Sequence, residues 1–219
     1  MKIFEQELAA LGDQFAELGS LATEAVIKAG KAFVDHDLVL AQEVLDSDHA
    51  INELQMKLEK RSFELIALYQ PVAADLRQVV GVLKAVTDLE RIGDHARNIA
   101  RRAIKLQSLT HLPEIEYNIG EMVKEVVLEL RDSLDSYANS NQETAQAIPE
   151  KFNETINGMY DQIAGPSYQA MSQNPGLINS AIIYLKVAQD LGRISDYGIN
   201  ICEWTIYLAT GKIVELKNY

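Results

Sequence analysis

The chain contains an internal repeat that divides it into two similar halves. The segment TDLERIGDHARNIA begins at Thr87, and QDLGRISDYGINIC begins at Gln189, 102 residues later. Polar residues recur in it as faithfully as apolar ones, in the pairs Asp88/Asp190, Arg91/Arg193, Asp94/Asp196 and Asn98/Asn200. Because packing alone does not require polar identity, the repeat indicates a related polar surface on each half.

Apolar residues recur at helical spacing along nearly the whole chain, and no segment alternates as a half-buried strand does. The pattern predicts helices over residues 5–34, 38–69 and 73–106, and three more that begin near residues 114, 143 and 177. Helices of this length joined by short turns lie antiparallel to their neighbours. The sequence therefore predicts an all-α fold of two tandem three-helix bundles, residues 1–107 and 114–219.

Each repeated helix carries a narrow apolar seam with steps of three and four residues, which predicts a core position. The seam of the third helix is Leu89, Ile92, Ala96, Ile99, Ala103 and Leu106, and that of the sixth is Leu191, Ile194, Gly198, Ile201, Thr205 and Leu208. Gly93 indicates close approach of a neighbouring helix. We expect Cys202 to be a buried small hydrophobe, and Trp204 and Tyr207 to pack against the fourth or fifth helix or at a dimer contact.

Composition excludes several classes of function. A formal net charge of −12 repels the nucleic-acid backbone, so we expect no DNA or RNA binding. The single cysteine rules out an internal disulfide framework and suits a reducing cytosol. No stretch approaches the roughly 20 apolar residues that a membrane-spanning helix needs, and none resembles a signal peptide. We therefore expect a cytoplasmic protein that associates with a membrane only through partners.

The polar side of the third helix predicts a cation site. Glu90, Asp94 and Asn98 project from it one turn apart, opposite the seam. Hard and borderline cations prefer such converging carboxylate and amide oxygens. Further candidate donors are Asp196, Asn200 and Glu203 on the sixth helix, and Asp48 and Asn52, which we expect to flank the third-helix face from the second helix.

Two other interpretations of these acidic faces remain open at this point. In the first, the chain is a metal-free helical adaptor, and Arg91, Arg97, Arg101 and Arg193 simply pair with neighbouring acids. In the second, it is a carboxylate-bridged metalloenzyme, which needs two inward-pointing Glu-x-x-His motifs. The sequence contains none, since Asp46 rather than a glutamate precedes His49 by three residues. The enzyme class is therefore disfavoured.

The segment LERIGDHARNIA closely resembles the E(D)xxxD signature of the PhoU family, and DLR at residues 75–77 and LK at 83–84 resemble the same family's approach to it. The resemblance covers essentially the whole chain. It implies two three-helix bundles, multinuclear iron or zinc clusters held by the signature carboxylates, and a homodimer. It also implies a non-enzymatic negative regulator of phosphate uptake and phosphate-starvation signalling, whose partners are phosphate ABC transporter components and a membrane sensor histidine kinase.

The chain departs from the family pattern differently in each half. Arg101 stands where the family often has a glutamate, Gly192 replaces the leading glutamate, and Tyr197 replaces the usual histidine. Asp190 is a further candidate ligand, although it lies about 120° around the helix from Asp196. Each half therefore lacks a different carboxylate.

Overall fold

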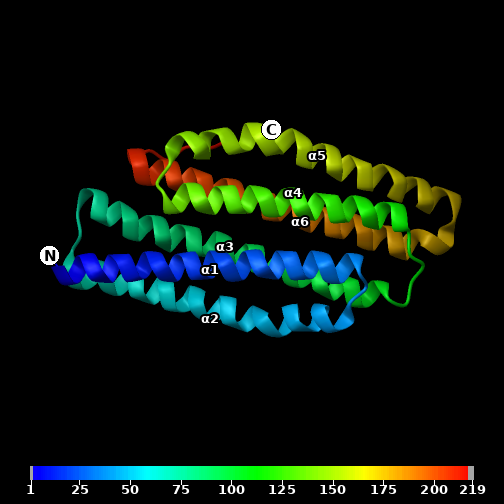
Figure 1. Ribbon diagram of the computed structural model, residues 1–219, viewed down its shortest axis with the longest axis horizontal. Coiled ribbons are helices and arrows are strands. Elements are labelled where there is room, and N and C mark those ends of the chain that lie inside the picture. Colours follow the sequence, from blue (N-terminus) through cyan, green and yellow to red (C-terminus); the bar gives the residue numbers. More distant parts are fainter. Residues whose placement is uncertain (1, 217–219) are drawn as a thin grey trace.

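The computed structural model describes residues 2–216, and their fold is all-α, as predicted (Figure 1). Residues 1 and 217–219, which belong to the two predicted bundle ranges, lie outside the described residues. Among the helices of the described part, none is long and apolar enough to cross a bilayer. The helices are α1 Lys2–Val34, α2 Leu38–Tyr69, α3 Ala73–Leu106, α4 Pro113–Ala138, α5 Gln142–Gln173, the 3-10 turn Pro175–Leu177 and α6 Ile178–Thr210.

Local capping chemistry explains where three of these helices begin. Asp37 accepts a hydrogen bond from the backbone N–H of Leu40 at 2.9 Å, which caps α2. Asn141 caps α5 in the same way, through the N–H of Thr144 at 3.1 Å. Pro113, predicted to belong to the connection, instead occupies the first turn of α4, where its missing N–H costs nothing.

The six helices form two three-helix bundles packed side by side. Helices α1, α2 and α3 contact one another, as do α4, α5 and α6. The bundles meet along α3 and α6 and along α1 and α4, which leaves α2 and α5 at opposite edges of the molecule (Figure 1). The boundaries proposed for the two bundles stay a prediction, because buried apolar residues of both halves belong to a single cluster.

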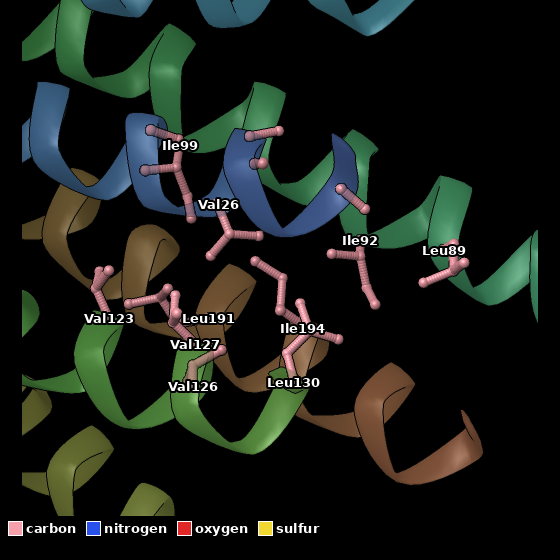
Figure 2. Close-up of a cluster of buried hydrophobic side chains, with 14 of the residues drawn as sticks. Val26, Leu89, Ile92, Ile99, Val123, Val126, Val127, Leu130, Leu191 and Ile194 are labelled. Carbon is pink, nitrogen blue, oxygen red and sulfur yellow. The ribbon is translucent and has the colours of Figure 1, made fainter. Parts of the chain in front are cut away.

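The core confirms the predicted seams with one exception. All six seam residues of α3 are buried, and five of the six on α6 are buried, whereas Leu208 is only partly covered. Figure 2 shows Ile92 and Ile99 of α3 and Val26 of α1 in the same cluster as Val126 and Ile194 of the second half. Helix α3 buries more than its seam because α6 covers it from a second side.

Glycine residues stand where neighbouring helices approach closely. A Cβ atom on Gly93 would lie 3.0 Å from Cδ1 of Ile51, which confirms the predicted close approach of α2. Between the bundles, a Cβ on Gly30 would lie 2.6 Å from Cγ1 of Val123, and one on Gly19 would lie 2.8 Å from Cδ2 of Leu134. The two inter-bundle contacts are equivalent when α1 and α4 are aligned with an offset of 104 residues, which pairs Gly19 with Val123 and Gly30 with Leu134.

Candidate functional site

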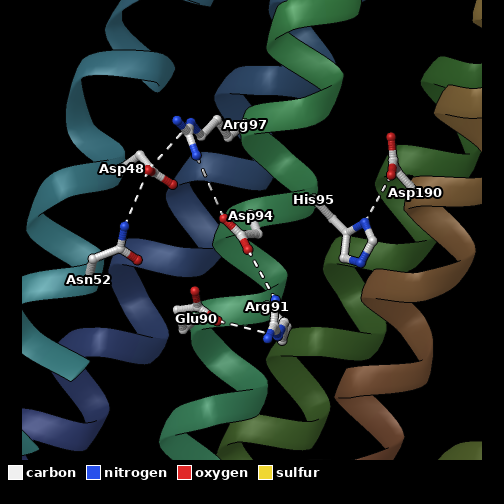
Figure 3. Close-up of polar contacts among 8 residues, drawn as sticks. All are labelled: Asp48, Asn52, Glu90, Arg91, Asp94, His95, Arg97 and Asp190. Carbon is white, nitrogen blue, oxygen red and sulfur yellow. Dashed lines mark hydrogen bonds and ion pairs between the residues drawn. The ribbon is translucent and has the colours of Figure 1, made fainter. Parts of the chain in front are cut away.

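Four of the five first-half candidates lie on the surface between α2 and α3 (Figure 3). Glu90 and Asp94 project from α3, one turn apart, toward Asp48 and Asn52 of α2. Asp48 is 8% exposed, and its Oδ2 accepts a hydrogen bond from Nδ2 of Asn52 at 3.3 Å. We call these four residues the α2–α3 acidic face. The expected flanking by the second helix is therefore present in the structure.

Two arginines of α3 pair with the carboxylates of this face. Arg91 lies 3.4 Å from Oδ2 of Asp94 and 3.6 Å from Oε2 of Glu90. Arg97 lies 3.4 Å from Oδ2 of Asp48 and 3.9 Å from Oδ1 of Asp94. These ion pairs are what the metal-free adaptor interpretation expects. Whether a metal ion takes their place stays a prediction.

Electrostatics nevertheless favour a cation on the α2–α3 acidic face. Partial burial, and then the negative charges of Asp94 and Asp48, raise the pKa of Glu90 above its ordinary value, and Arg91 opposes the shift. A bound cation would remove both the repulsion and part of the desolvation cost. Three carboxylates and one amide also form a donor set that hard or borderline cations accept. The first half therefore offers the donor types that a metal ion needs, although the carboxylate oxygens of Glu90, Asp94 and Asp48 do not all lie within 4.8 Å of one another.

The equivalent surface of the second half, between α5 and α6, is hollow. A cavity of about 160 Å³ lies there, lined by residues that include Asn153, Asn157, Gly192, Ser195 and Asp196. Gly192 occupies the position of Glu90, and a Cβ built on it would meet nothing within 4 Å. Asp196 supplies the lone carboxylate among the lining residues. This donor set is poorer than that of the α2–α3 acidic face and does not fit a multinuclear cluster.

The remaining candidate ligands do not join either group of residues. Oδ1 of Asp88 accepts a hydrogen bond from Nδ2 of Asn200 at 2.9 Å, and Oε1 of Glu203 accepts one from the backbone N–H of Leu216 at 2.8 Å. Asn98 is partly exposed on α3, and Arg101 is exposed. The structure thus brings four of the nine predicted ligands into one group, and the ligand role of all nine stays a prediction.

Asp190 lies in the interface between the two bundles rather than beside Asp196. It is 5% exposed, it pairs with the guanidinium of Arg102, and its Oδ1 lies 2.9 Å from Nδ1 of His95 (Figure 3). The nearby helix α3 therefore surrounds Asp190 with positive and hydrogen-bonding groups. These contacts explain why an aspartate is present at this position without invoking a metal.

The repeated partner of Asp190, Asp88, in turn contacts α6. Asp88 of α3 accepts hydrogen bonds from Asn200 and, at 2.9 Å, from Nε1 of Trp204 on α6. The indole N–H of Trp204 thus contacts α3, and the expected packing of Trp204 and Tyr207 on the fourth or fifth helix or at a dimer contact stays a prediction. The rings of His95 and Tyr197, which occupy equivalent positions, lie 5.8 Å apart. An approximate two-fold axis therefore passes between α3 and α6 near these rings.

A carboxylate with no exposed surface distinguishes the second bundle from the first. Glu129 of α4 is fully buried, and burial raises its pKa to about 8 although the nearby Ser195 hydroxyl acts in the opposite direction. Under the pairing of Gly19 with Val123, Glu129 corresponds to Ala25 of α1. Sequence reasoning missed Glu129 because it stands outside the repeated segment. Cys202 is buried beside it, as predicted, and burial raises its pKa to about 11, so its thiol is unreactive.

Comparison with known families agrees with the resemblance seen in the repeat. Two segments of the chain, residues 15–103 and 119–205, each match the PhoU domain. The phosphate-specific transport system accessory protein PhoU homolog of Clostridium acetobutylicum is 34% identical and covers 99% of each chain. The homolog of Aquifex aeolicus is 37% identical over 98% of this chain and 96% of its own.

Solved structures are similar over the same length. The crystal structure of PhoU from Pseudomonas aeruginosa covers 95% of this chain and 100% of its own, with a TM-score of 0.89 at 29% identity. That of the phosphate transport system regulatory protein PhoU from Streptococcus pneumoniae has a TM-score of 0.88 at 32% identity, covering 97% of this chain and 100% of its own. Both similarities extend across the two bundles.

Proposed function

The chain belongs to the PhoU family, and we propose that it is a negative regulator of phosphate uptake and of phosphate-starvation signalling. The observation that carries the proposal is the end-to-end similarity to proteins whose names describe accessory proteins of the phosphate-specific transport system. The regulator acts through protein contact and not through catalysis. Its partners are components of a phosphate ABC transporter and a membrane sensor histidine kinase.

Surface chemistry supports a mechanism based on docking. A net charge of −12 favours basic partner surfaces over nucleic acid. The outer helix α2 exposes Met56 and Phe63, each 59% exposed and two turns apart on the same side of the helix. Exposed apolar groups with a polar rim are typical of interaction sites. We place the contact at the cytoplasmic face of the membrane, with a homodimer as the acting form.

A bound cation is part of this proposal for the first half alone. The α2–α3 acidic face would hold an iron or zinc ion. The ion would supply positive charge that shapes the docking surface. Arg91 and Arg97 already neutralise this face in part. The metal-free adaptor is the alternative, and it shares the regulatory function.

A reporter assay tests the regulatory function. The full chain is expressed in a bacterium that lacks its own PhoU-family gene and carries a phosphate-starvation reporter. In phosphate-rich medium we expect the reporter to fall to the level given by the bacterium's own regulator. Met56→Glu/Phe63→Glu is expected to lose this repression while it remains folded, whereas Tyr168→Glu, 58% exposed on α5, retains it. Undiminished reporter activity with well-expressed, folded wild-type protein would contradict the proposal.

A further inference from the structure

A second cluster of potential ligands lies at one end of the molecule, far along the helices from the acidic face. His36 belongs to the turn between α1 and α2, His111 to the connection between α3 and α4, and Glu116 to the first turn of α4. Both connections lie at the same end of the bundles (Figure 1). Within the described residues, these are the three His, Cys, Asp or Glu side chains whose ligand atoms all lie within 4.8 Å of one another.

From this geometry we infer a mononuclear divalent-metal site, with zinc as its ion. Nε2 of His36 lies 3.4 Å from Oε2 of Glu116, and Nδ1 of His111 lies 2.9 Å from Oε1 of the same carboxylate. Ligand atoms around a tetrahedral zinc with bonds of about 2.0–2.1 Å are separated by roughly 3.3 Å. Small side-chain rotations therefore bring all three groups onto one ion. Two imidazoles and one carboxylate with a water in the fourth position form a common zinc donor set.

Glu116 itself is the second observation that points to a cation. Its carboxylate is buried, 5% exposed, and its ion pairs among the described residues are with the two histidines. No lysine or arginine among the described residues forms an ion pair with Glu116. A buried carboxylate without a lysine or arginine beside it is costly. A divalent cation at this position would supply the positive charge.

The surroundings of Glu116 already hold it in place. The Tyr184 hydroxyl of α6 donates a hydrogen bond to Oε1 of Glu116 at 2.7 Å, and it accepts one from the backbone N–H of Leu112 at 2.9 Å. The rings of His36 and His111 contact each other edge to face, with centroids 4.1 Å apart. Such outer groups orient metal ligands and sharpen affinity. A zinc ion here would fasten the first bundle's α1–α2 turn to the second bundle.

Zinc titration of full-length protein, freed of metal with a chelator that is then removed, tests the inference. The background is Glu90→Ala/Asp94→Ala, so that the α2–α3 acidic face does not contribute. We expect this protein to bind one zinc ion and its Tm to rise on binding. His36→Ala and His111→Ala should each weaken binding at least 100-fold. The control is His49→Ala, an exposed histidine 3.5 Å from Glu53, and it should leave binding unchanged.

Two further measurements decide the matter if a histidine variant folds poorly. Tyr184→Phe keeps the packed ring, removes the hydrogen bond to Glu116, and should weaken zinc binding about 10-fold. X-ray absorption of the zinc-loaded background should give two imidazole nitrogens around the metal. No zinc uptake by the background, or equal uptake by His36→Ala/His111→Ala, overturns the inference. Because the inference does not rest on the proposed function, these results leave the reporter assay unaffected.

Discussion

The α2–α3 acidic face and the hollow groove between α5 and α6 occupy equivalent places in the two bundles, yet they differ in chemistry. In the first, Glu90 joins Asp94 and Asp48, and two arginines compensate the charge. In the second, Gly192 leaves a hollow of about 160 Å³ beside Asp196. Both surfaces share the same helix packing and one repeated aspartate, Asp94 in the first half and Asp196 in the second. The comparison teaches that a repeated framework can keep its packing while its polar content diverges.

The largest expected difference between the two surfaces is in metal content. Protein purified without chelator or affinity tag is expected to contain iron or zinc bound at the α2–α3 acidic face, beyond any zinc held at the His36–His111–Glu116 cluster. Glu90→Ala/Asp94→Ala should lose all of this metal and remain folded, because both side chains face away from the core and their surface ion pairs stabilise by about 1 kcal/mol or less. Elemental analysis with circular dichroism measures both.

Asp196→Ala is the matched control for that experiment, since it removes the equivalent aspartate of the second groove. We expect its metal content to equal that of the wild type. Loss of metal in this variant would show that both surfaces bind metal. Unfolding of Glu90→Ala/Asp94→Ala would contradict the assignment of these side chains to the surface.

The next largest effect concerns pH and the buried Glu129, which has only an alanine as its counterpart in the first bundle. In the folded protein the pKa of Glu129 is about 8, above the ordinary 4.5. Between these two pH values the folded state therefore holds a proton that the unfolded state has released. The stability that this proton confers is complete below about pH 4.5 and is lost as the pH rises through 8. We expect Glu129→Gln to be more stable than wild type at pH 8, by on the order of a few kcal/mol, and similar at pH 5.

Urea unfolding across this pH range measures the Glu129 effect. Glu121→Gln is the control, because that carboxylate lies on the same helix and is 39% exposed beside Lys124. The control should run parallel to wild type. If the unfolding free energy of Glu129→Gln has the same pH dependence as that of the wild type, the Glu129 carboxyl group is solvated. The two bundles then do not differ in burying a carboxyl group.

A smaller effect is expected at the interface where the two repeated aspartates exchange contacts. Asp190→Ala leaves Arg102 partly buried without its partner and should cost about 3 kcal/mol of unfolding free energy. Asp88→Ala removes hydrogen bonds from Asn200 and Trp204 and should cost about 1–2 kcal/mol. Equal losses in urea unfolding would show that the exchange is energetically symmetric.

The smallest effect is expected at the position that makes the second groove hollow. Gly192→Ala should raise the unfolding free energy by about 0.5–1 kcal/mol, because alanine loses less backbone entropy in a helix and its Cβ meets open space. Gly30→Ala is the contrasting variant, since its Cβ would lie 2.6 Å from Val123. We expect Gly30→Ala to lower the unfolding free energy. A loss of stability in Gly192→Ala would mean that the hollow is filled.

The helices and their seams were predictable because apolar periodicity and turn residues are local signals. Every predicted helix exists, and its ends differ from the prediction by only a few residues, as at Lys2 and Pro113. The convergence of Asp48 and Asn52 with Glu90 and Asp94 followed from the antiparallel packing of neighbouring helices. These features require no knowledge of how the two bundles meet.

The interface between the bundles was not predictable, because it depends on which side of α3 faces α6. Asp190 and Asn200 looked like further ligands since their residue types suit a cation, yet their side chains bind partners on α3. Asn153 and Asn157 line the second groove, and they could have been found because NETING at 153–158 aligns loosely with DHAINE at 48–53. His36 and His111 lie in connections, where sequence carries no periodic signal.

His95 and Tyr197 face each other where the approximate two-fold axis crosses the interface. In a symmetric pair of separate half-length chains, a residue on the axis always meets a copy of itself, and any substitution is made twice. Joining the two copies in one polypeptide removes that constraint. A histidine opposite a tyrosine is therefore an arrangement that only the fused chain can encode, and each of the two positions can change without the other.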